Sequence, residues 1–310
     1  MIEIQRILCP IDFSEYSRHA VDHAVALARQ YQSTITALHV FPTVPVMAYA
    51  PGMPGFDPIV LTPTLRDQLL VDLKGFIDTE STPGVPMEPV IREGDPVSEI
   101  LSQATDMNAD LLVMGTHGRS GFERLLLGSV TEKILRKAGC PVLTVPRRHP
   151  DAVPGTPVLF KQILCPVDFS DCSLEALKYA LSLAQEGDAH VTVLHVIGDE
   201  LEVTPDAYGA IIMNDLETLA DFRKRHEDDA RQRLKEAVPE SVAEYCSVET
   251  VVSRGAKPSR EILRLAAEQR TDLIVVGVQG RGAVDLVFFG STTNHVVREA
   301  TCPVLTVRRR

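Results

Sequence analysis

Short apolar runs alternate with segments of helical periodicity along the chain. Residues 5–11 predict a buried strand, and Ser14 stands where it can cap the helix that follows. The apolar side chains of that helix recur at helical spacing, at Ala20, Val21, Ala24, Val25, Leu27 and Ala28. The start of the chain therefore predicts a strand followed by an amphipathic helix.

The same alternation continues as far as residue 145. Further strands are expected at 34–40, 87–92, 111–114 and 141–145, and further helices at about 63–80, after Asp95 and at 129–138. The Pro-, Gly- and Met-rich segment 41–63 is expected to be a loop long enough to suggest function or mobility. Strands that alternate with helices predict right-handed βαβ crossovers and a mainly parallel five-stranded sheet.

The whole pattern then occurs a second time. The segment ILCPIDFS at 7–14 returns as ILCPVDFS at 163–170, LHV at 38–40 returns at 194–196, and CPVLTV at 140–145 returns at 302–307. We therefore predict an α/β protein of two tandem doubly wound domains, each with helices on both faces of its sheet. The expected bounds are 1–148 and 161–310, joined by a proline-containing linker at 149–160.

Composition narrows the functional classes. The 310 residues are 45% apolar and 24% charged, and no apolar run approaches the ~18–20 residues that a membrane span needs. A net charge of −11 argues against nucleic-acid binding, which depends on surplus Lys and Arg. Six cysteines without zinc-like spacing are interpreted as reduced core thiols. Because the N-terminal residues do not resemble a signal peptide, we expect a cytoplasmic protein.

An aspartate ends the first strand of each copy, at Asp12 and at Asp168. Ligands of open parallel sheets bind at the carboxyl ends of strands near the switch point, where a carboxylate can accept hydrogen bonds from a ribose or a base. The alternative is that each Asp only shapes the turn ahead of Ser14 or Ser170. Since those serines already supply the helix cap, we favour the nucleotide-binding interpretation.

A second polar feature follows the fourth strand of each copy. Its glycines let the backbone approach an anion, and its serine begins a helix whose N-terminal N–H groups favour phosphate. The pattern is G-x-x-G, nine residues, then G-S, at Gly115, Gly118, Gly128 and Ser129 in copy one and at Gly277, Gly280, Gly290 and Ser291 in copy two.

The same serine could instead open a capping box. Ser129 is followed three residues later by Glu132, as such a box requires. In copy two Asn294 replaces that glutamate, yet the glycines and Ser291 keep their spacing. We therefore favour a phosphate site over a purely structural cap.

Together these motifs resemble the universal stress protein family, in particular its ATP-binding branch. The likeness spans nearly all of 1–146 and 161–308 and depends on the CP-[IV]-DFS, LHV, glycine-serine and CPVLTV segments. The resemblance implies a doubly wound sheet, an adenine nucleotide under the loop after the fourth strand, and pairing of the two domains through their final strands. It leaves open a further homodimer.

The resemblance also implies roles for individual residues. Asp12 and Asp168 would meet the ribose or base, and the backbones of Val40 and Val196 would meet the adenine. The phosphates and ribose would be held by Gly115, Gly118, Gly128, Ser129 and Val130 in copy one, and by Gly277, Gly280, Gly290, Ser291 and Thr292 in copy two. Arg119 and Arg281 could neutralise the outer phosphates, or they could simply be solvated loop residues.

The histidines receive a structural interpretation. His19 and His23 lie one helical turn apart, but copy two has Glu175 and Tyr179 there and no third ligand is evident, so no metal site is expected. The histidine of each LHV segment lies inside a strand and is interpreted as a structural side chain with satisfied hydrogen bonds.

Three functions remain open on the sequence. The leading hypothesis is a regulatory or stress-response protein that binds ATP, ADP or AMP with Mg²⁺, without catalytic residues, because no P-loop and no nucleophile–base set is present. The second is a slow ATPase or autophosphorylating protein that uses Ser129 or Ser291. The third is a scaffold with vestigial nucleotide sites. The pathway, the protein partners and the preferred nucleotide do not follow from the sequence.

Overall fold

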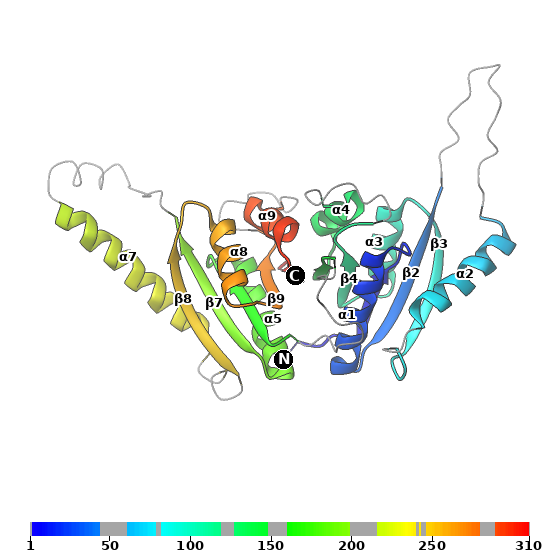
Figure 1. The fold of residues 1–310 in the computed structure, drawn as a ribbon, viewed down its shortest axis with the longest axis horizontal. Coiled ribbons are helices and arrows are strands. Elements are labelled where there is room, and N and C mark those ends of the chain that lie inside the picture. The colour runs from blue at the N-terminus through cyan, green and yellow to red at the C-terminus, as the bar shows by residue number, and fades with distance from the viewer. Residues whose placement is uncertain are drawn as a thin grey trace, which may run out of the picture. The chain divides into compact units, whose positions relative to one another are not determined.

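The chain divides into two units, which we call the first unit (Glu3–Leu159) and the second unit (Phe160–Arg309). The computed structural model describes residues 2–43, 61–78, 82–118, 127–147, 160–198, 216–239, 242, 246–279 and 289–309. Within these ranges each unit alternates strands with helices, as Figure 1 shows.

The first unit contains five strands and four helices among its described residues. In chain order they are β1 (Arg6–Pro10), α1 (Glu15–Tyr31), β2 (Thr34–Pro42), α2 (Pro63–Ile77), β3 (Met87–Gly94), α3 (Pro96–Asp106), β4 (Leu111–Gly115), α4 (Ser129–Lys137) and β5 (Val142–Val145). The strand order is β3-β2-β1-β4-β5, and all neighbours are parallel. The order changes direction between β1 and β4, which is the switch point of the sheet.

The second unit repeats this plan among its described residues. Its elements are β6 (Gln162–Pro166), α5 (Asp171–Gly187), β7 (His190–Ile197), α7 (Leu216–Ala237), β8 (Ser247–Arg254), α8 (Pro258–Glu268), β9 (Leu273–Gly277), α9 (Ser291–Glu299) and β10 (Val304–Val307). The order β8-β7-β6-β9-β10 is again parallel throughout, with the switch point between β6 and β9.

The core lies on both faces of each sheet. Ile7, Leu8 and Leu112 of the central strands are fully buried, and every residue of β4 is buried. The helix α1 contacts α2, and α3 contacts α4. Because right-handed crossovers that run in opposite directions place their helices on opposite faces, these two pairs cover the two sides of the sheet. The predicted fold class is confirmed.

Most of the expected elements are present with shifted ends. The strand expected at 34–40 continues to Pro42, and the helix expected at 63–80 ends at Ile77. Thr62 caps that helix by accepting a hydrogen bond from the Leu65 N–H, and Asp95 caps α3 in the same way. Residues 44–60 of the expected long loop lie outside the described residues.

Burial agrees with the interpretation of the cysteines. All six are free and buried. Burial raises the pKa of the Cys9 and Cys302 thiols to about 12, so both remain protonated at neutral pH. Among the described helices, none combines the length and apolar character that crossing a bilayer requires.

Candidate functional site

Two segments meet at the switch point of the first unit: the turn after β1 (Ile11–Ser14) and the start of the loop after β4. A Cβ atom built on Gly118 would lie 2.6 Å from Asp12 Oδ2. A side chain at this position would displace the carboxylate, so the close approach of the two groups favours glycine. The expected neighbours Asp12 and Gly118 are brought together.

The Asp12 carboxylate is fixed by its own turn. Its Oδ1 atom accepts hydrogen bonds from the Ser14 N–H at 3.0 Å, from Ser14 Oγ at 2.6 Å and from Ser17 Oγ. Ser14 also caps α1, since its Oγ accepts from the Ser17 N–H. The two interpretations of Asp12 are thus compatible: one oxygen shapes the turn, and the other faces the loop after β4.

The second unit has the same turn. Asp168 Oδ1 accepts from the Ser170 N–H at 3.0 Å and from Ser170 Oγ at 2.6 Å. Ser170 Oγ also lies 3.3 Å from the carbonyl oxygen of Gln279, in the loop after β9. The turn and the loop therefore meet at the switch point in both units.

The first glycine of each motif has a packing reason of its own. A Cβ on Gly115 would lie 2.7 Å from Tyr16 Cβ on α1, and a Cβ on Gly277 would lie 2.8 Å from the backbone of Cys172 and Ser173 on α5. Close approach of a helix explains both glycines without a ligand. Their predicted contact with phosphate stays a prediction.

The start of α4 is tied to the end of β4. The Gly128 N–H donates to the Thr116 carbonyl at 2.9 Å, and Thr131 Oγ1 donates to the Gly115 carbonyl at 3.0 Å. In the second unit Gly290 and Thr293 make the matching hydrogen bonds, to Val278 and Gly277, at 2.9 and 2.7 Å. These bonds hold each helix N-terminus at the carboxyl end of the sheet.

The capping-box alternative for Ser129 is wrong. Gly128 occupies the N-cap of α4, Ser129 is the exposed first residue of the helix, and no side-chain cap is formed. Glu132 pairs instead with Arg136 at 2.8 Å. Gly290 and Ser291 begin α9 in the same uncapped way. An uncapped first turn leaves N–H groups for an anion, as the phosphate hypothesis requires.

The remaining expected residues fall into two groups. Val130 and Thr292 are the half-buried second residues of α4 and α9, while Val40 and Val196 are half-buried near the ends of β2 and β7. Outside the described residues lie Arg119, Gly280 and Arg281.

Sequence reasoning missed the pair formed by Thr116 and His117. Thr116 Oγ1 lies 3.0 Å from His117 Nδ1, and the His117 ring centroid lies 5.2 Å from that of Tyr16. His117 Nε2 is buried, with no hydrogen-bond partner in the described part of the chain. Val278 and Gln279 stand at these positions in the second unit, so the two copies differ here. This difference between the two copies is the sequence signal that could have pointed to the pair.

The structural interpretation of the other histidines is supported by their hydrogen bonds. His19 Nδ1 lies 3.1 Å from the Pro146 carbonyl oxygen, and His23 Nδ1 lies 2.9 Å from that of His19. Each imidazole therefore donates to a backbone acceptor.

Comparison with known proteins places these observations in a family. The chain matches the universal stress protein family over residues 3–146 and 159–308. A universal stress protein of Methanocaldococcus jannaschii is 33% identical over 141 residues, covering 46% of this chain and 81% of that protein. One of Mycolicibacterium smegmatis is 26% identical over an alignment of 319 residues, covering 98% of this chain and 97% of that protein.

A solved structure shares the fold over the full length. The crystal structure of a universal stress protein from Archaeoglobus fulgidus covers 99% of this chain and 97% of its own, with a TM-score of 0.64 and 24% sequence identity. At this identity the likeness shows the fold alone.

Proposed function

The chain belongs to the universal stress protein family, and from this premise we propose that each of its units binds an adenine nucleotide (ATP, ADP or AMP) in a regulatory or stress-response role. The observation that carries the proposal is the uncapped N-terminus of α4 and of α9, beside the aspartate turn of the same unit. The same arrangement is present in both units, which supports a role in binding.

The proposed binding mode uses three parts of each unit. The first N–H groups of the helix, at Ser129 and Val130 in the first unit, hold phosphate oxygens and exploit the helix dipole. The Asp12 carboxylate accepts hydrogen bonds from the ribose. The backbone of Val40 contacts the adenine, as the family resemblance implies. The same roles fall to Ser291, Thr292, Asp168 and Val196 in the second unit.

Mg²⁺ would enter this site with the nucleotide. The phosphates and water molecules would supply most of its oxygen ligands, which is the usual mode of magnesium binding at nucleotide sites. Within the described residues no group of three metal-ligating side chains occurs. The chain's own contribution is then to hold the phosphates.

A charge placed at the helix N-terminus tests the proposal. We expect calorimetry on nucleotide-free protein to show two ATP molecules per chain, and Ser129→Glu to remove one of them by repulsion of the phosphates. A glutamate in the first turn of a helix interacts favourably with the helix dipole and stabilises the helix by about 0.3–1 kcal/mol. We therefore expect the variant to keep its fold.

The matched control is Ser129→Gln, which has the same size without the charge. Because Ser129 is exposed, the glutamine variant should keep a binding stoichiometry of two. Wild-type protein that binds no adenine nucleotide, or a glutamate variant that binds as the wild type does, contradicts the proposal.

A further inference from the structure

The residue that follows each aspartate has an unusual backbone. Phe13 has φ of 64° and Phe169 has φ of 63°. Bulky residues rarely adopt this left-handed conformation, and it persists only where the surroundings enforce it. The same outlier at the same place in both units calls for a shared cause.

One shared neighbour is a histidine of the adjacent strand. The Phe13 ring centroid lies 4.7 Å from that of His39, and the Phe169 centroid lies 4.6 Å from that of His195. The other aromatic and cationic neighbours differ, since Phe76 contacts Phe13 while the Arg233 guanidinium lies over Phe169. Among these contacts of the described residues, the histidine contact is the one that both rings share.

The same histidines also hold the residue before the aspartate. His39 Nδ1 donates to the Ile11 carbonyl at 2.7 Å, and His195 Nδ1 donates to the Val167 carbonyl at 2.7 Å. The Ile11 N–H donates to the Leu38 carbonyl, also at 2.7 Å. Residues on both sides of Asp12 are therefore fixed by β2, one through its backbone and one through its ring.

We propose that His39 and His195 are positioning residues for the nucleotide, in that they set Asp12 and Asp168 in place to accept hydrogen bonds from the ribose hydroxyls. In this role each histidine acts on the aspartate through the neighbouring carbonyl and phenylalanine ring of the turn, and it does not touch the ligand. This inference rests on the proposed nucleotide binding and deepens it. A histidine that only fills the core would stabilise the unit, and its loss would affect the binding of nucleotides with and without ribose hydroxyls equally.

The geometry of the carboxylate explains why its placement matters. Asp12 Oδ1 is engaged by Ser14 and Ser17, and Oδ2 stands 2.6 Å from where a Gly118 Cβ would be. A rotation of the turn would move the carboxylate into the Gly118 backbone or away from the site. Holding the turn in advance lowers the cost of ordering it when the ligand binds.

The test compares two nucleotides that differ only in the sugar, ATP and 2′,3′-dideoxy-ATP, on protein whose second site is closed by Ser291→Glu. We expect His39→Leu to weaken ATP binding by about tenfold, as the loss of a well-placed hydrogen bond implies. Binding of the dideoxy nucleotide should change less than about twofold, because its sugar has no hydroxyl groups for Asp12.

Two amide variants separate positioning from packing. The side-chain nitrogen of asparagine can take the place of Nδ1, whereas that of glutamine lies nearer to the place of Nε2. His39→Asn should therefore restore most of the ATP affinity, and His39→Gln should show the sugar-dependent loss even if the leucine variant fails to fold. His195 variants should reproduce the pattern in Ser129→Glu protein.

Three results would overturn the inference. Equal losses of ATP and dideoxy-ATP affinity would show that the histidine only supports the fold, and unchanged affinity for both would show that it has no part in binding. Wild-type protein that binds neither nucleotide would remove the proposed function itself. That last result is distinguishable because it precedes any substitution.

Discussion

At the scale of single residues, glycines of the same motif serve different purposes. Gly115 is required by the approach of α1, whereas Gly118 is required by the approach of the Asp12 carboxylate. Both glycines belong to the same sequence motif, so the sequence alone attributes both of them to ligand binding. The two roles are distinguished by the atoms that a Cβ at each glycine would meet.

Gly115→Ala is expected to destabilise the first unit. Its Cβ would lie 2.7 Å from Tyr16 Cβ and 3.1 Å from the Tyr16 carbonyl carbon, so α1 must shift. Overpacking of this kind lowers the free energy of unfolding by about 1–3 kcal/mol. Urea unfolding followed by circular dichroism measures the change.

Gly75→Ala provides the control for that substitution. Gly75 lies in α2, and nothing stands within 4 Å of its missing Cβ. Alanine should raise the free energy of unfolding by about 0.5–1 kcal/mol through its helix propensity. If the two variants behave alike, the packing argument for Gly115 fails.

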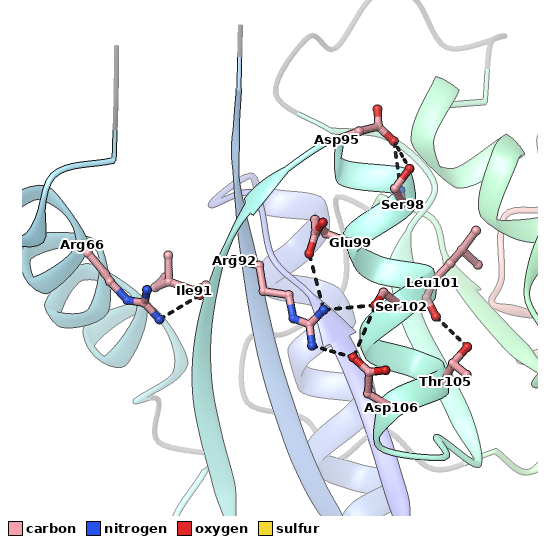
Figure 2. A network of polar contacts seen from close by, with 10 residues as sticks. All are labelled: Arg66, Ile91, Arg92, Asp95, Ser98, Glu99, Leu101, Ser102, Thr105 and Asp106. Carbon is pink, nitrogen blue, oxygen red and sulfur yellow. Dashed lines mark hydrogen bonds and ion pairs between the residues drawn. The ribbon is translucent and has the colours of Figure 1, made fainter. Parts of the chain in front are cut away.

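At the scale of elements, each unit links the helix that precedes its fourth strand, α3 or α8, to an edge strand through polar side chains. In the first unit Arg92 of β3 donates to Asp106 at 2.8 Å and to Ser102 and Glu99 at 3.3 and 3.4 Å, as Figure 2 shows. The second unit has the arginine on the helix instead: Arg264 of α8 pairs with its neighbours Glu261 and Glu268.

In the second unit Ser253 of β8 completes the link by donating to Glu261 at 2.9 Å. The arginine of this network thus lies on the strand in the first unit and on the helix in the second, while the acidic residues lie on the helix in both units.

A transposition of these residues tests the equivalence. Arg92→Ser should lower the free energy of unfolding by about 0.5–1 kcal/mol, because the ion pairs are partly exposed and solvent screens them. Adding Ser102→Arg reproduces the arrangement of the second unit and should recover part of the loss. In the wild-type background, Ser102→Arg should raise the free energy of unfolding by less than it does in the Arg92→Ser background, because Arg92 repels the new charge. A purely additive pair of effects in the double-mutant cycle would refute the transposition.

The cap of α3 gives an acid-sensitive element. The Ser98 N–H and Oγ both donate to Asp95 Oδ2 at 2.9 Å, and these hydrogen bonds lower the pKa of the Asp95 carboxyl below its ordinary value of 3.8. The folded pKa is therefore below the unfolded one. The resulting stabilisation is present above about pH 4 and is lost as the pH falls through the folded pKa.

Asp95→Asn should remove this contribution while keeping the cap. Asparagine caps helices about as well as aspartate, so stability at pH 7 should change little. As the pH falls below about 4, the variant should lose stability less steeply than the wild type. Parallel acid-unfolding curves for the two proteins would show that the Asp95 hydrogen bonds do not matter for acid sensitivity.

At the scale of the whole molecule, the duplication yields two related but unequal units. In the first unit the Thr116–His117 hydrogen bond of 3.0 Å restrains the two residues with which the loop after β4 begins. Val278 cannot form it, since valine has no hydroxyl group. A restrained loop loses less entropy when it binds a ligand.

We therefore expect the first unit to bind ATP more tightly than the second. Ser291→Glu protein leaves the first site and Ser129→Glu protein leaves the second, so calorimetry on the two variants compares them directly. Thr116→Val should bring the first site toward the affinity of the second by removing the hydrogen bond. Equal affinities in the two single-site proteins would contradict this ranking.

Much of the fold follows from local information. The strand and helix positions could be predicted because hydrophobic periodicity and caps such as Ser14 and Asp95 act within a few residues of chain. Less of the site could be predicted. The left-handed backbone of Phe13 has no sequence signal, because nothing local favours positive φ for a phenylalanine. The expected pairing of the units through their final strands stays a prediction.

By itself the sequence determined that one α/β unit occurs twice and that each copy keeps an aspartate turn and a glycine-serine segment. Repetition and spacing are properties of the chain alone. The tertiary structure decided which groups meet: it showed that Gly128, not Ser129, is the N-cap of α4, that Gly118 faces Asp12, and that His39 holds the turn that carries Asp12. Those contacts depend on neighbouring strands and helices packing together, which no short segment encodes.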